Sequence, residues 1–154
     1  MEIRERTFTF DSVATGKRIF VRVTEPVNLS DVVGVLQIVH GMAEHSGVYR
    51  DFATFMAQNG YVVAAHAHLG HGQSVSSGAD YGYFENGGCR NLVMDTKKLH
   101  TILREEYENL PFFLFGHSMG SFICRAYMAR FGSDMKAAVF MGTSAGPGTA
   151  VGQL

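Results

Sequence analysis

Residues 112–120 read FFLFGHSMG, and this stretch decides the fold. The apolar run from Phe112 to Phe115 predicts a short buried strand. Met119 to Phe131 then has the pattern of a helix, which ends at Gly132. A strand that turns sharply into a helix predicts that the residues at the turn lie at the carboxyl end of a sheet, where sheets of this kind bind ligands.

The turn itself, Gly116-His117-Ser118-Met119-Gly120, fits the G-x-S-x-G pattern of a nucleophile elbow. Such a turn exposes the oxygen of the serine in a strained backbone conformation. Side chains two residues to either side would collide with neighbouring backbone, so glycine is needed there. We therefore predict Ser118 as a catalytic nucleophile, with Gly116, His117 and Gly120 as the supporting turn.

The same pattern occurs a second time, in residues 142–146 (GTSAG), which also follow an apolar run. Pro147 and Gly148 come next, so a helix is not expected to begin there. Ser144 is therefore interpreted as part of an ordinary turn at the end of a strand.

On either side of residues 112–131, segments with strand patterns alternate with segments with helix patterns, which predicts a doubly wound α/β sheet. Two nearly continuous apolar runs are typical of central parallel strands, and two segments of alternating polarity near the start predict an antiparallel edge hairpin. The predicted strands are Ile3 to Phe10, Lys17 to Thr24, Val32 to Val39, Tyr61 to Ala65 and Ala137 to Met141. The predicted helices are Val48 to Gln58, with an apolar stripe of Val48, Phe52, Phe55 and Met56, and Cys89 to Glu108.

A second candidate element, His40-Gly41-Met42, directly follows the strand that ends at Val39. Loops in this position supply a backbone N–H to an oxyanion hole, so the amides of Met42 and Met119 are the candidate pair of donors. We interpret His40 as a structural histidine whose ring hydrogen-bonds the nearby loop, because its loop is the wrong one for a general base.

A third group, His66, His68 and His71, could indicate a metal site together with His40 and His45. No carboxylate or cysteine lies in the segment to complete a tetrahedral set, so no metal is expected. We interpret Gly70 and Gly72 instead as turn residues that bring this loop near Ser118. Cys89 and Cys124 fit no disulfide or metal pattern and are interpreted as buried free thiols.

These three segments together resemble the monoacylglycerol lipase, lysophospholipase and serine aminopeptidase-like (S33) group of α/β-hydrolases. The resemblance rests on residues 40–46 (HGMAEHS) with Tyr49, on residues 68–74 (HLGHGQS) and on residues 116–120 (GHSMG). It implies an α/β-hydrolase core, a mostly parallel sheet with an antiparallel amino-terminal hairpin, truncated after the sixth strand. It also implies a serine hydrolase that cleaves carboxylic esters of lipids and needs no cofactor.

The chain departs from this group in two ways. Relatives usually carry an aspartate where this chain has Ala67. In this fold the acid and the histidine of the triad follow the serine, yet the residues after Ser118 contain Asp134 as their one acid and no histidine. We interpret Asp134 as a solvated turn residue at the far end of the sheet. The resemblance therefore places the triad acid, its histidine and the cap beyond Leu154, and residues 1–154 are interpreted as one incomplete domain.

On this interpretation the 154-residue chain is weak or inactive alone. The alternative is a non-catalytic fragment or degenerate hydrolase that only binds a ligand or partner. The formal net charge of −1 argues against nucleic-acid binding, and the start of the chain lacks the apolar run of a signal peptide, so a cytoplasmic location is expected. The final strand, Ala137 to Met141, would leave an apolar edge, which predicts self-association.

Overall fold

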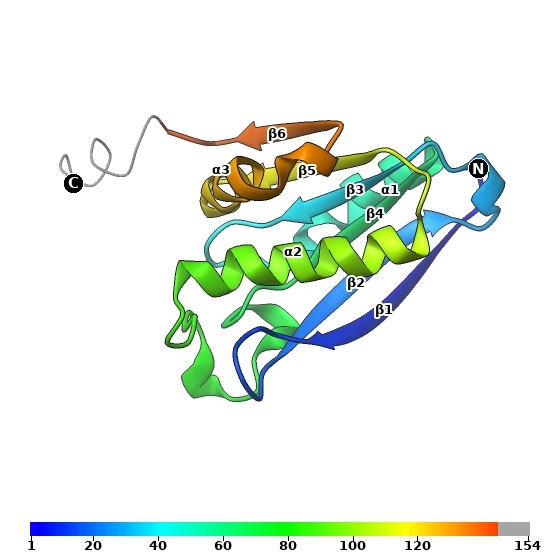
Figure 1. The fold of residues 1–154 in the computed structure, drawn as a ribbon. Coiled ribbons are helices and arrows are strands. Elements are labelled where there is room, and N and C mark those ends of the chain that lie inside the picture. The colour runs from blue at the N-terminus through cyan, green and yellow to red at the C-terminus, as the bar shows by residue number, and fades with distance from the viewer. Residues whose placement is uncertain (145–154) are drawn as a thin grey trace.

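The computed structural model describes residues 1–144, which form one mixed sheet with helices on both faces (Figure 1). The strands are β1 (Ile3–Asp11), β2 (Arg18–Pro26), β3 (Gly34–Val39), β4 (Tyr61–His66), β5 (Phe112–His117) and β6 (Ala137–Met141). They lie in the order β1-β2-β4-β3-β5-β6. The pairs β1–β2 and β2–β4 are antiparallel, whereas β4–β3, β3–β5 and β5–β6 are parallel. Because Val39 is in register with Gly116, the loops after β3 and β5 leave the sheet side by side.

Three α-helices cover this sheet. They are α1 (Arg50–Gln58), α2 (Cys89–Glu106) and α3 (Met119–Phe131). In Figure 1, α2 lies in front of the sheet and α1 behind it. Short 3-10 helices occupy the connections: η1 (Leu29–Asp31), η2 (Ser46–Tyr49), η3 (Gly72–Ser74), η4 (Gly78–Asp80) and η5 (Gly132–Asp134).

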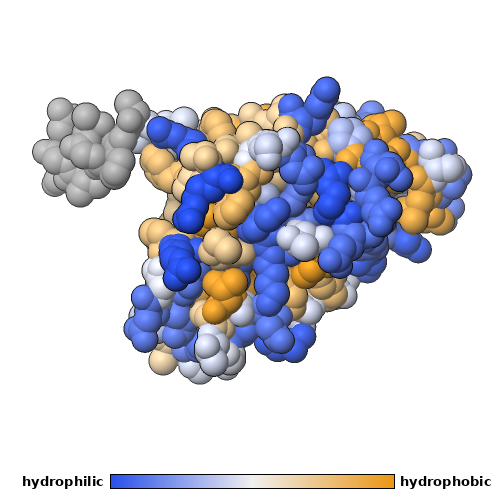
Figure 2. All heavy atoms as spheres, in the orientation of Figure 1, coloured by the Kyte–Doolittle hydropathy of each residue, from blue (hydrophilic) through white to orange (hydrophobic). Residues whose placement is uncertain are grey.

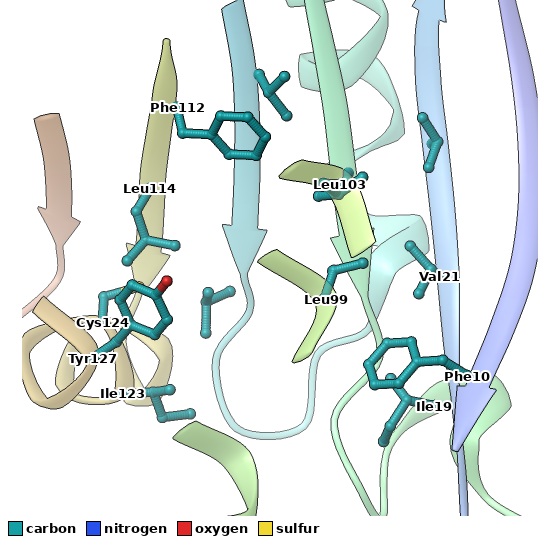
Figure 3. Close-up of a cluster of buried hydrophobic side chains, with 14 of the residues drawn as sticks. Phe10, Ile19, Val21, Leu99, Leu103, Phe112, Leu114, Ile123, Cys124 and Tyr127 are labelled. Atoms are coloured by element: carbon teal, nitrogen blue, oxygen red, sulfur yellow. The ribbon is translucent and has the colours of Figure 1, made fainter. Parts of the chain in front are cut away.

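The larger hydrophobic core lies between the sheet and the helices α2 and α3. Figure 3 shows Leu99 and Leu103 of α2 over the strands, and Cys124 and Tyr127 of α3 beside Leu114. A smaller cluster on the other face joins α1 to the central strands: Leu36, Ile38, Tyr49, Ala53, Val63 and Ala65. The central strands are thus buried on both faces, as their continuous apolar runs predict.

The predicted strands and helices are confirmed, with small shifts at their ends. The helix expected from Val48 begins as the 3-10 helix η2 and becomes α1 at Arg50, and α2 ends at Glu106 instead of Glu108. The α/β class with its antiparallel hairpin and otherwise parallel sheet is also confirmed.

Two predictions about burial are wrong. The apolar stripe expected on α1 faces the sheet only in part: Val48 and Phe55 are exposed, and the fully packed positions of the helix are Ala53 and Ala57. Met56 packs on the smaller cluster, and the ring of Phe52 lies 5.6 Å from that of Phe115 at the rim of the helix. Small alanines allow the helix backbone to approach the sheet closely, so the larger side chains lie to the side of the contact or point outward. Cys124 is buried as expected, but Cys89 is exposed because it begins α2 at the surface.

The β6 side of the sheet is apolar and open to solvent. Val139, Phe140 and Met141 are all exposed, as is Phe122 on the neighbouring α3. Hydrophobic side chains are visible toward the α3 and β6 side of the face drawn in Figure 2. Within residues 1–144, no helix combines the length and the apolar character needed to cross a membrane.

Candidate functional site

Ser118 occupies a strained turn between β5 and α3. Its backbone has φ 51° and ψ −122°, a conformation that residues with a side chain rarely adopt. The turn is held from both sides, since the Ser118 N–H donates to the carbonyl of Met141 (2.9 Å), and the Ser121 hydroxyl donates to the carbonyl of Ser118 (2.6 Å). A tertiary scaffold thus stabilises the conformation that a nucleophile elbow requires.

Glycine is needed on both sides of Ser118 because backbone atoms lie there. A Cβ atom at Gly116 would lie 2.5 Å from the carbonyl oxygen of Gly120, and one at Gly120 would lie 2.0 Å from the carbonyl oxygen of Val39. The start of α3 therefore packs directly on the end of β3. This contact is the steric reason for the G-x-S-x-G spacing.

The loop after β3 lies against the elbow. A Cβ atom at Gly41 would be 3.0 Å from the Ser118 Cβ atom, so the two segments touch at this point. The Nδ1–H of His40 donates to the carbonyl of Gly41 (2.7 Å). Because the Gly41–Met42 peptide is trans, the Met42 N–H points away from that carbonyl. Among the residues described, this N–H has no acceptor, and the same holds for Met119 N–H at the first residue of α3.

Buried histidines hold the rest of this loop. The Nε2–H of His68 donates to the carbonyl of His40 (3.1 Å), and Nε2 of His40 in turn accepts the backbone N–H of His68 (3.0 Å). Nε2 of His71 accepts the N–H of Ala43 (3.1 Å), which supports the positive φ of Ala43. These contacts require neutral imidazoles, because Nε2 of His40 and of His71 acts as an acceptor. Burial lowers the pKa of His40 to about 4, which keeps its ring in that neutral form.

His66 contributes no hydrogen bond to the loop. Its ring is fully buried against His68, and neither of its ring nitrogens has a partner among the described residues. Burial, followed by the proximity of His40, lowers the pKa of His66 to about 3, and the pKa of His68 also lies well below its ordinary value. No group of three or more histidine, cysteine or acidic side chains in the described part of the chain is arranged to hold a metal ion.

Glu44 is a site residue that sequence reasoning missed. Its Oε2 accepts the N–H of Gly41 and the hydroxyl of Tyr49, each at 2.7 Å, and its Oε1 lies 2.8 Å from Nδ1 of His117. Partial burial raises the pKa of this carboxyl, but the three donors outweigh burial and hold the pKa below its ordinary value. A signal is present in the sequence, because Glu44 and Tyr49 lie within the motif of residues 40–49, yet their partner His117 comes from a distant segment.

The structure brings together Ser118, the amides of Met42 and Met119, and the supporting residues His40, Gly41, Gly116, His117 and Gly120. His40 has the structural position predicted from the sequence. Asp134 lies at the opposite end of the sheet, as expected, but it is not merely solvated: it pairs with His100 (2.6 Å) and Arg104 (2.9 Å). Through Ser144, the segment after β6 forms no helix. Residues 145 and 146 of the second G-x-S-x-G segment, and Pro147 and Gly148 after them, lie outside the described residues.

A pocket of about 900 Å³ opens beside the loop after β3. Its walls include residues 42–47 and residues 70–73, together with Arg22 and Tyr81. Ser118 and Met119 are not among the residues that line it, so this pocket is separate from the space directly above the serine.

Comparison with protein families gives a match over most of the chain. The family model described as "Serine aminopeptidase, S33" matches residues 30–153. The matched range contains the loop after β3, the histidine-rich loop and the elbow.

Individual relatives agree with this match. The chain is 35% identical over 120 residues to a monoacylglycerol lipase of Mycolicibacterium smegmatis and 33% identical over 113 residues to a monoglyceride lipase of Homo sapiens. These matches cover 73% and 71% of this chain but only 39% and 34% of the two relatives. Among solved structures, a thermostable carboxyl esterase from Bacillus coagulans in complex with glycerol superposes with a TM-score of 0.84 at 33% identity, covering 94% of this chain and 45% of the esterase.

Proposed function

Because this chain belongs to the serine aminopeptidase (S33) family of α/β hydrolases, we propose that it acts on carboxylic esters through an acyl-enzyme on Ser118. The observation that carries the proposal is the backbone of Ser118, held at φ 51° between β5 and α3 and directly beside Gly41. Strain of this kind persists where surrounding contacts impose it, and it is typical of functional sites.

In the proposed reaction, the Ser118 oxygen attacks the ester carbonyl carbon and its proton passes to a base. The carbonyl oxygen becomes an oxyanion, which the amides of Met42 and Met119 would receive. The C–O bond to the alcohol then breaks, and the alcohol leaves with the proton. Water repeats the sequence on the acyl-enzyme, which releases the carboxylic acid and regenerates the Ser118 hydroxyl.

We propose that the base is a histidine outside residues 1–154, oriented by a carboxylate that also lies outside them or belongs to a second chain. The described histidines support this assignment. His40, His68 and His71 are buried and engaged with the loop backbone, and His117 directs Nδ1 to Glu44. An incomplete triad retains about 10³ to 10⁴ of the acceleration over water, so this chain alone should turn over esters slowly.

For the substrate, we propose a lipid ester with a single acyl chain, of the monoacylglycerol or lysophospholipid class. Support comes from the two relatives named as monoacylglycerol or monoglyceride lipases. No cofactor takes part in this mechanism. We further propose a cytoplasmic location for the reaction.

The test is covalent labelling with a fluorophosphonate, followed by peptide mapping. Here and below, imidazole is added in place of the base that we propose outside residues 1–154, and labelling of this chain is expected to be slow. We expect the adduct on Ser118, no adduct in Ser118→Ala, and unchanged labelling in Ser144→Ala, the matched control from the second G-x-S-x-G segment. An adduct on Ser144 would overturn the assignment of the nucleophile. A folded protein that takes no label would favour the non-catalytic alternative.

A further inference from the structure

We infer that Glu44 is a positioning residue of the oxyanion hole, holding the loop that carries the Met42 amide against the turn that carries Ser118. This inference rests on the proposed function, because it gives the Met42 amide a role in receiving the oxyanion. Glu44 itself does not touch the reacting atoms. It acts through the peptide group of Gly41 and the ring of His117.

The carboxylate of Glu44 joins three separate elements of the fold. Oε2 holds the Gly41 N–H of the loop after β3 and the Tyr49 hydroxyl of η2, and Oε1 meets Nδ1 of His117 at the end of β5. Hydrogen bonds to an ionised acceptor are about twice as strong as those between neutral groups. The side chain of Glu44 is 23% exposed, so these contacts are partly shielded from water.

The backbone amides of the loop after β3 differ in whether they have a hydrogen-bond acceptor. The Gly41 N–H donates to Glu44, the Ala43 N–H to His71, and the Glu44 N–H weakly to the carbonyl of Gly41 at 3.4 Å. The Met42 N–H, lying between them, has no acceptor within residues 1–144. A loop whose neighbouring amides are all engaged therefore presents one free donor in a fixed direction.

Close packing around Gly41 links the position of the loop to that of Ser118. Gly41 is already in contact with Ser118, since a Cβ atom there would lie 3.0 Å from the Ser118 Cβ and 3.2 Å from both Glu44 Oε2 and the carbonyl oxygen of His117. The distance between the Met42 and Met119 amides thus depends on how the Gly41 peptide is seated. A misplacement of about 1 Å at a reacting centre can cost about 10²-fold in rate.

The substitutions Glu44→Gln and Glu44→Ala separate the parts of this arrangement. Glutamine keeps a carbonyl oxygen that can accept the Gly41 N–H, but it loses the charge that faces His117. Alanine removes all three contacts, including the one with the Tyr49 hydroxyl. The control is Glu108→Gln, an exposed residue at the far end of the sheet whose side chain takes part in no hydrogen bond or ion pair within residues 1–144.

The experiment measures two quantities on the full chain: the second-order rate of fluorophosphonate labelling of Ser118, and the chemical shift of the Gly41 amide proton by NMR. We expect labelling to fall by roughly 10-fold to 10²-fold in Glu44→Ala and by less in Glu44→Gln, with Glu108→Gln at the wild-type rate. The Gly41 amide proton should be downfield in the wild type, move upfield in Glu44→Ala and move only partly in Glu44→Gln.

The two readouts distinguish failure of this inference from failure of the proposed function. If the Gly41 amide shifts as expected but Ser118 takes no label even in the wild type, the proposed function fails while the hold of Glu44 on the loop stands. If folded Glu44→Ala labels at the wild-type rate, or its Gly41 amide does not move, the positioning role is overturned. Should Glu44→Ala fail to fold, Glu44→Gln decides by the same two criteria.

Discussion

The buried ring of His66 predicts that acid destabilises the folded chain and that one substitution removes a defined part of this effect. In the unfolded chain a histidine has a pKa of about 6.5. In the folded chain, burial and the proximity of His40 lower the pKa of His66 to about 3. Between these values the unfolded state binds a proton that the folded state does not, so stability falls as the pH falls.

The magnitude follows from the pH interval. At pH 5 the pH is about 1.5 units below the pKa of His66 in the unfolded chain. Each unit corresponds to about 1.36 kcal/mol, so His66 lowers the free energy of unfolding by about 2 kcal/mol between pH 7 and pH 5. The substitution His66→Leu keeps a similar volume and removes a ring whose two nitrogens lack partners. Its own effect at pH 7 should therefore be small.

The assay is urea unfolding at pH 7 and pH 5. We expect the wild type to lose about 2 kcal/mol more than His66→Leu over this interval. The control is Gln58→Leu, an exposed position without a titratable side chain; it should retain the wild-type pH dependence. If His66→Leu and the wild type lose the same free energy of unfolding, His66 is not held neutral by burial and the reasoning is refuted.

Two further predictions concern backbone strain and the sheet edge. Ser118→Gly should raise the free energy of unfolding by about 1 kcal/mol relative to Ser118→Ala, because glycine adopts the positive φ without cost and alanine retains a Cβ atom; equal thermal melting of the two variants would contradict this. We also expect the chain to self-associate through the exposed edge strand β6, and Val139→Lys to shift it toward monomer in sedimentation velocity, whereas a wild type that sediments as a monomer at all concentrations would contradict this.

The order of strands and helices could be predicted from the sequence because each element has a strong local signal. The runs that form β3 and β4 are nearly continuous in apolar residues, and the turn at Ser118 has glycines at fixed positions. The orientation of α1 could not be predicted in the same way. Its periodicity puts phenylalanines on one stripe, whereas the tertiary fold brings the small side chains of Ala53 and Ala57 to the sheet.

The site was only partly predictable for a related reason. Ser118 and the amides of Met42 and Met119 follow from motifs that are local in the chain. The contact between Glu44 and His117 depends on β3 and β5 being neighbours in the sheet, and no local pattern records it. The roles of His68 and His71 as backbone partners also depend on this packing, so a cluster that could be weighed as a metal site is instead a support for the loop.

The contact of Gly120 with the carbonyls of Val39 and His40 has a consequence for how the site forms during folding. The loop after β3 and Ser118, to which we assign the oxyanion hole and the nucleophile, come from segments far apart in the chain, and they meet only when α3 docks on the end of β3. Neither half of the site can therefore be preorganised before this long-range contact exists, and a local opening that lifts α3 would dismantle both halves together. The protection of the α3 amides against hydrogen exchange should then report the fraction of molecules with an assembled site.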